Sequence, residues 1–212
     1  MNSPEDAAET LARGLAARLV HDLAGPAAGV MSGLDLLADP KAADLHDDAL
    51  DLTRASARAL RDWLAFFRLI FADRPEDQTA AALHTLALIP FEGRRAKLQF
   101  PDETSPVGAV AGQTLLLMLL VAVGGLASGG EAVVSTVAAA GGTRLRVESR
   151  GPRASLADET LRGLRGEGFE TGLRGRWAPA RYAHTLCVGR GGALTLTPLD
   201  DGFALEAVLP ET

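Results

Sequence analysis

The first segment of the chain has the pattern of a long amphipathic helix. Over residues 17–37, large aliphatic side chains recur at steps of three and four, which places them on one stripe of a helix. Leu11 and Leu15 continue this stripe, so we predict a helix over about residues 4–38, with a kink at Pro26. The stripe consists of Leu19, Leu23, Pro26, Val30, Leu34 and Leu37.

A second amphipathic helix is predicted to follow after a short connection. Asp39 is a good N-cap and Pro40 suits the first turn, and an apolar seam then continues to about Phe71. So short a connection makes the two helices antiparallel neighbours. Two helices cannot bury both seams by themselves, so we expect a homodimer in which two hairpins form a four-helix bundle. The alternative is that the second part of the same chain covers the apolar seams of the two helices.

The pattern changes after the polar, proline-containing stretch at residues 73–77, which we interpret as a hinge. We therefore predict a helical domain at 1–73 and a second domain at 74–212. Helices and antiparallel strands mix in the second domain, which indicates an α+β sandwich. Helices are predicted at about 77–88, 107–127, 155–164 and 179–188, and strands at 96–100, 132–139, 144–149, 193–197 and 203–209.

The helix at 107–127 is apolar enough to raise the question of a membrane span. No charged residue occurs from Ser105 to Gly130, a length that reaches across a bilayer. However, the hydropathy of the stretch is lowered by Gln113, Thr114 and several glycines. No group of basic residues next to it marks a cytoplasmic side. We predict a helix buried under a sheet, and no membrane partner.

The amino-acid composition limits the classes of protein to which the chain can belong. Hydrophobic residues make up 47% of the 212, enough for a sizeable core, and the single cysteine excludes an intrachain disulfide framework. The net charge of −6 argues against nucleic acid as a partner. The acidic first residues lack the apolar core of a secretory signal, so we expect a cytoplasmic protein.

His21 is the first candidate for chemistry, because it lies on the far side of the predicted helix from the apolar stripe. An imidazole is largely neutral near pH 7, so its ring can act as a nucleophile, for example towards a phosphoryl group. Asp22 is adjacent and can orient the ring. An ordinary surface histidine is the alternative at this stage.

The surrounding residues favour the functional interpretation. The string His21-Asp22-Leu23-Ala24-Gly25-Pro26 resembles the H-box of two-component histidine kinases, and LVHDLAGPAAGVMSGLDLL resembles the ChpT-type histidine phosphotransferases of alphaproteobacteria. The resemblance implies an α+β protein: an N-terminal antiparallel helical hairpin that forms a four-helix bundle by dimerisation, then a degenerate histidine-kinase-type ATPase-like α/β sandwich. It also implies that His21 carries phosphate, helped by Asp22, between the receiver domains of a hybrid kinase and of response regulators. No cofactor of its own is implied, and Mg²⁺ is expected from the receiver.

Three nucleotide signatures of the kinase fold are missing from the second domain. The helix QTLLLMLLVAVGGLA has no Asn for Mg²⁺, and RVESRGPRA stands where Asp-x-Gly-x-Gly would follow a strand. Trp177 and Pro179 occupy the position of the phosphate-wrapping loop. These departures favour a phosphotransferase. A divergent ATP-dependent kinase and a non-catalytic dimeric scaffold remain alternatives.

Two further groups of residues suggest partner contacts. Gly25, Ala28 and Ser32 share the face of His21 and are small, so a partner helix can approach closely there. Because Gly25 replaces the polar residue that orients water in many kinases, we do not expect strong phosphatase activity. A glycine-rich region runs from Gly163 to Gly175. The arginines in it and next to it are candidates to bind an acidic surface of a partner: Arg162, Arg165, Arg174 and Arg176.

The remaining histidines and the cysteine are not predicted to be catalytic or to bind a metal. His46, His84 and His184 fall in no metal-binding spacing, so we expect no metal site. Cys187 is expected in the core.

Overall fold

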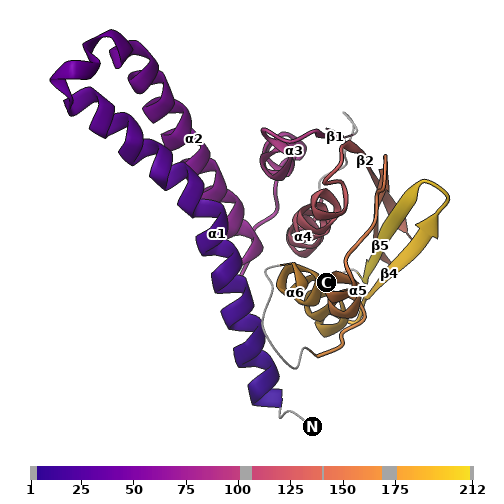
Figure 1. The fold of residues 1–212 in the computed structure, drawn as a ribbon. Coiled ribbons are helices and arrows are strands. Elements are labelled where there is room, and N and C mark those ends of the chain that lie inside the picture. Colours follow the sequence, from indigo (N-terminus) through magenta and orange to yellow (C-terminus); the bar gives the residue numbers. More distant parts are fainter. Residues whose placement is uncertain (1–3, 101–106, 140, 169–175, 211–212) are drawn as a thin grey trace.

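The computed structural model describes residues 4–100, 107–139, 141–168 and 176–210. Two long helices, α1 (Pro4–Ala38) and α2 (His46–Ile70), form an antiparallel hairpin that stands against the rest of the molecule (Figure 1). The helix predicted over residues 4–38 is confirmed, and it continues as a helix through Pro26.

The connection between the two helices differs in part from the expectation. Residues 40–45 form a 3₁₀ turn, η1 (Pro40–Leu45), and the α-helix begins only at His46. Asp39 is the N-cap of this turn, and its carboxylate accepts a hydrogen bond from the backbone N–H of Lys41 at 2.9 Å. The buried Ala42, inside this turn, has φ −103° and ψ 23°, outside the helical range, so the backbone bends within the turn itself.

Glycines bring α1 and α2 close together. A Cβ added to Gly29 would collide with the hydroxyl of Ser56, and one added to Gly33 would collide with the hydroxyl of Thr53. At Gly33 it would also lie 2.9 Å from the backbone oxygen of Ala49, which no side-chain rotation can relieve. The absence of a side chain at these positions therefore sets the spacing of the hairpin.

A five-stranded sheet forms the outer layer of the second part of the chain. The strands are β1 (Ala96–Gln99), β2 (Gly130–Ala139), β3 (Gly142–Arg150), β4 (Ala193–Leu199) and β5 (Gly202–Pro210), in the order β1-β2-β3-β5-β4. The expectation of purely antiparallel strands is wrong at one edge, because β1 pairs with β2 in parallel. The chain passes between them through α4 (Ala109–Gly125), and such a crossover returns the second strand in the same direction. The α+β class is confirmed.

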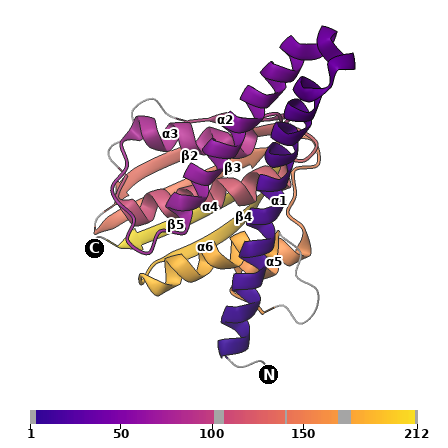
Figure 2. The same ribbon diagram turned by 90° about the vertical axis from the view of Figure 1, so that its left-hand side faces the viewer.

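Helix α4 is the centre of the structure: it lies between the sheet and the α1–α2 hairpin, with α3 (Ala80–Leu88) on one side of it and α6 (Trp177–Gly189) on the other (Figures 1 and 2). Its side chains from Ala111 to Val123 are buried, which explains the lack of charge in this stretch. The short turn η2 (Ile89–Phe91) and α5 (Asp158–Leu164) also lie around it. No helix within the described ranges combines the length and hydropathy that a membrane crossing needs.

The end of α2 is attached to α4. Phe66, Phe67 and Ile70 are buried in the same core as the α4 side chains. The buried amide of Gln113 donates hydrogen bonds to the backbone oxygens of Leu69, in the last turn of α2, at 3.0 Å and of Ala72, just after the helix, at 2.8 Å. Carbonyls at a helix end lack the full set of partners within the helix, so these bonds help to satisfy them. The division into domains at residues 73 and 74 stays a prediction.

The spacing of the hairpin can be tested by adding one methyl group. We expect Gly33→Ala to lower the free energy of unfolding by about 1–2 kcal/mol, because a forced contact costs more than the helical preference for alanine returns. Gly124→Ala in α4 is the matched control, since its Cβ meets nothing within 4 Å, and it should raise stability by about 0.5–1 kcal/mol. Urea unfolding at one protein concentration measures both. Equal effects of the two changes would contradict the close approach.

Candidate active site

His21 lies on α1 beside the second part of the chain, with 78% of its side chain exposed. Its Nδ1 atom is 3.0 Å from Oδ1 of Asp22. An ionised carboxylate can only accept a hydrogen bond, so Nδ1 carries the proton and Nε2 keeps its lone pair. The ring therefore presents its nucleophilic nitrogen away from Asp22.

The carboxylate of Asp22 lies between the guanidinium of Arg18 and the imidazole of His21. Only 3% of its side chain is exposed, and its second oxygen, Oδ2, accepts a hydrogen bond from Nε of Arg18 at 2.6 Å. Arg18 lies one helical turn before Asp22, which is the spacing of side-chain pairs on a helix. The guanidinium compensates the buried negative charge and fixes the carboxylate that orients His21. The predicted pair of His21 and Asp22 is thus in contact, and Arg18 is a member that the sequence analysis did not single out.

The small residues next to His21 are exposed. Gly25, Ala28 and Ser32 all lie on the solvent side of α1, and a Cβ at Gly25 would have no atom within 4 Å. This part of the helix surface is therefore open to an approaching partner. Their role in binding a partner stays a prediction.

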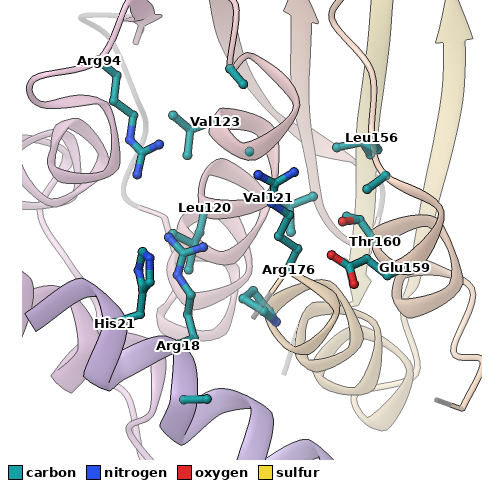
Figure 3. Close-up of a pocket in the computed structure, with 15 residues that line it drawn as sticks. Arg18, His21, Arg94, Leu120, Val121, Val123, Leu156, Glu159, Thr160 and Arg176 are labelled. Atoms are coloured by element: carbon teal, nitrogen blue, oxygen red, sulfur yellow. The ribbon is translucent and has the colours of Figure 1, made fainter. Parts of the chain in front are cut away.

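A cavity of about 750 Å³ lies next to His21, between α1, the C-terminal end of α4, α5 and the start of α6. Figure 3 shows His21 and Arg18 on one side, with Arg94 and Arg176 directed into the same space. Aliphatic side chains from α4 and from the chain before α5 also line the cavity: Leu120, Val121, Val123 and Leu156. The lining therefore mixes arginines, the acidic Glu159 and aliphatic side chains.

The arginines of the glycine-rich region do not form one group. Arg162 and Arg165 lie near Glu167, at 3.4 Å and 3.9 Å, and Arg162 also donates a hydrogen bond to the backbone oxygen of Gly168. Arg176 instead lines the cavity, and Arg174 lies outside the described residues. Arg94, on the turn before β1, reaches the cavity although nothing in its local sequence signals this.

The positions of the missing nucleotide signatures can now be located. The α4 residues at the cavity are aliphatic or glycine, with no Asn among them. Arg150, at the end of β3, forms ion pairs with Glu148 and Asp201. Trp177 is buried, with its indole N–H donating to the backbone oxygen of Glu167, and Pro179 lines the cavity.

The other candidate groups lie elsewhere. His46 is exposed, His84 stacks on Phe100, and Nδ1 of His184 is 2.9 Å from the backbone oxygen of Leu164. Cys187 is buried, and burial raises the pKa of its thiol to about 11, so it stays protonated near neutral pH. No group of three metal-ligating side chains occurs among the residues that the structure describes.

Comparison with known proteins places the chain in a family. Residues 81–202, more than half of the chain, match the family described as "Histidine phosphotransferase C-terminal domain". The chain therefore belongs to the histidine phosphotransferase family, and the resemblance drawn from the residues around His21 is confirmed at this level. A search of curated proteins finds no match.

A solved structure shows the same fold. The chain is similar to a bacterial phosphotransferase solved at 1.7 Å, with a TM-score of 0.79, 20% identity and 98% of each chain covered. It is more distantly similar to the histidine kinase domain of a blue-light-activated kinase from Erythrobacter litoralis, with a TM-score of 0.45, 15% identity, and 88% of this chain and 95% of that one covered.

The role of Asp22 is open to a direct test. Asp22→Asn removes the charge that favours a proton on Nδ1 and leaves Arg18 without its anionic partner, so phosphorylation of His21 should slow about 100-fold. The initial rate of label transfer from a phosphorylated receiver domain measures this. Glu9→Gln is the matched control, because Glu9 forms the same kind of helical pair with Arg13 in an exposed position. A rate within about three-fold of the unmodified protein would show that Asp22 does not orient the ring.

Proposed function

We propose that this member of the family carries a phosphoryl group on His21 between aspartates of receiver domains, in the cytoplasm and without using ATP. The observation that supports this most directly is the exposed imidazole whose Nδ1 is held by a buried carboxylate. This arrangement leaves Nε2 accessible to a large partner, as transfer between two proteins requires.

The transfer step follows from the orientation of the ring. Nε2 of His21 attacks the phosphorus of a phosphoaspartate, so that an N–P bond forms while the O–P bond to the aspartate breaks. The leaving carboxylate stays on the receiver, and Mg²⁺ held by the receiver would offset the charge of the phosphoryl oxygens. Asp22 stabilises the positive charge that develops on the imidazole. Reversal of the step delivers the phosphoryl group to a second receiver.

Loss of ATP use is proposed from the lining of the cavity. The α4 positions at the cavity lack the Asn that would hold Mg²⁺. Arg150, where an acid or a small residue is expected, forms ion pairs with Glu148 and Asp201. Pro179, at the start of α6, cannot donate a backbone hydrogen bond to a phosphate.

A homodimer through the hairpin is part of the proposal. The stripe on α1 is covered only in part, because Leu19 and Leu23 pack against the core while Leu34 stays exposed. On α2, Leu52 and Leu64 are exposed as well. A second hairpin would bury these side chains in a four-helix bundle, at about 25 cal/mol for each Å² of apolar surface removed from water.

The proposed function predicts a defined labelling pattern. Acid-labile label should pass to the protein from a phosphorylated receiver domain of a hybrid kinase, should not come from ATP alone, and should be lost in His21→Ala. His46→Ala is the matched control, since this histidine is exposed on the same hairpin and should accept no label. Label from ATP alone would make the protein a kinase. No label from several receivers would favour a scaffold.

The proposed docking face predicts a separate effect. Ala28→Phe fills the open surface next to His21, so transfer should slow at least ten-fold while the dimer persists. Ala12→Phe places the same side chain at an exposed position of α1 on the far side from His21 and should leave transfer unchanged. Transfer rates combined with light scattering on a sizing column measure both properties. Unchanged transfer in Ala28→Phe would remove Ala28 from the contact.

A further inference from the structure

We propose that Arg18 is a catalytic residue of the phosphotransfer, and that its guanidinium binds the oxygens of the phosphoryl group on Nε2 of His21. The inference deepens the proposed function and rests on it, because it adds to the site a second residue that contacts the transferred group. The bond to Asp22 leaves most of the donors of this guanidinium available, at a position next to the reactive ring.

Arg18 lies next to His21 on the surface of α1. The two residues are three positions apart, and residues at this spacing on a helix are neighbours, with about 5–6 Å between their Cβ atoms. Both side chains line the same cavity, and Figure 3 shows the guanidinium of Arg18 beside the imidazole of His21. Among the described residues that line this cavity, Arg18 is the arginine on the same helix as the histidine.

The carboxylate of Asp22 fixes both groups at once. Its Oδ1 atom lies 3.0 Å from Nδ1 of His21, and its Oδ2 atom accepts a hydrogen bond from Nε of Arg18 at 2.6 Å. The imidazole and the guanidinium are therefore held at the two oxygens of one carboxylate. Since both side chains also line one cavity, a phosphoryl group that the ring directs into this space meets the guanidinium.

The guanidinium of Arg18 has donors that Asp22 does not use. A guanidinium carries five N–H donors in a planar fork, and Nε supplies one of them to Asp22. Among the described residues, Asp22 is the acceptor found for this side chain, so the terminal nitrogens Nη1 and Nη2 keep N–H groups for a ligand. Phosphoryl oxygens suit such a fork, because two parallel N–H groups can bind two of them.

Arg18 is held more firmly than an ordinary surface arginine. Its side chain is 15% exposed, whereas Arg13, which forms the same kind of helical pair with Glu9, is 72% exposed. Donors that are already fixed lose little conformational freedom on binding and need no reorganisation as charge develops. Partial burial also strengthens their attraction to an anion, because the surroundings have a lower dielectric constant than water.

The charges at the site require a cation once His21 is phosphorylated. As the N–P bond to Nε2 forms, the O–P bond to the receiver aspartate breaks, and the proton on Nδ1 stays in place beside Asp22. When the receiver leaves with its carboxylate and its Mg²⁺, the phosphoryl oxygens lose that cation, while the carboxylate of Asp22 remains near and repels them. Arg18 is the cation that stays, since it belongs to the same helix.

The test is a double-mutant cycle on the rate of transfer, measured in single turnovers with an excess of phosphorylated receiver domain. Arg18→Gln should slow transfer about 100-fold, as expected when a preorganised donor to a developing anion is removed. Because Arg18 also anchors Asp22, the same change is made in the Asp22→Asn protein. There Arg18→Gln should slow transfer by about a further ten-fold, since the contact with the phosphoryl group does not depend on the carboxylate.

Two further readouts report on the same contact. Arg18→Lys keeps the positive charge but not the planar fork, so its rate should lie between those of Arg18→Gln and the unmodified protein. In the Asp22→Asn protein, where effects through the carboxylate are already lost, Arg18→Gln should also lower the share of label on His21 at equilibrium with the receiver. The guanidinium stabilises the phosphorylated histidine, so its removal returns label to the receiver.

Arg13→Gln is the matched control, because Arg13 forms the same kind of pair on α1 in an exposed position and should leave rate and equilibrium unchanged. Circular dichroism melting confirms that each variant is folded. The double variant keeps the test open if Arg18→Gln alone unfolds, because it removes both charges of the pair and leaves no buried charge without a partner.

The inference is overturned if Arg18→Gln transfers within about three-fold of the unmodified protein, a difference close to the limit of additivity. It is also overturned if Arg18→Gln has no further effect on Asp22→Asn, in which case Arg18 only positions the carboxylate. Either result leaves the phosphotransfer function intact. If the unmodified protein accepts no label from any receiver, the proposed function fails, and this inference fails with it.

Discussion

The attachment of the α2 end to α4 is the constraint on which the rest of the arrangement depends. Gln113 is a polar side chain in an otherwise apolar helix, and its burial is tolerated because its amide donates to the backbone oxygens of Leu69 and Ala72. An unsatisfied buried amide would cost about 1–3 kcal/mol, so this contact specifies one way of docking the hairpin on the core. The aromatic side chains of Phe66 and Phe67 supply the apolar area around it. Since α1 packs on α2, this one attachment also places His21 at the edge of the cavity.

Electrostatics at His21 follow from the burial of Asp22. A carboxylate that is 3% exposed needs compensation, and Arg18 supplies it from the preceding turn of the same helix. The remaining oxygen is then free to hold Nδ1 of the histidine. The site is thus built within two turns of one helix, which explains how a reactive imidazole can remain exposed and still have a fixed tautomer.

The second part of the chain has a layered fold whose helices line the cavity beside His21. Aliphatic side chains occupy the cavity end of α4, and Arg150 is engaged with Glu148 and Asp201. The helices around the cavity pack on α4 and on the sheet. The space next to His21 is therefore lined by arginines together with aliphatic side chains.

The spacing of residues along the sequence was enough to predict helix α1 and the contacts around His21. Helical periodicity predicted α1 with its observed bounds, and the contact between His21 and Asp22 follows from adjacent positions on a helix. Arg18 was within reach of the same reasoning, because it lies four residues before Asp22. Neighbours on one helix are set by backbone geometry, so the sequence determines them directly.

Other features required the tertiary structure. The non-helical backbone at Ala42, the parallel pairing of β1 with β2, and the close approach at Gly33 depend on packing between elements. The presence of Arg94, Arg176 and His21 in the lining of one cavity is of the same kind, since the three residues come from separate segments of the chain. Periodicity carries no information on such contacts, because they are decided by how the hairpin docks on α4. The sequence by itself therefore determined the histidine, its carboxylate and the Arg18 that pairs with it, and the tertiary structure decided which cations from other segments line the cavity beside them.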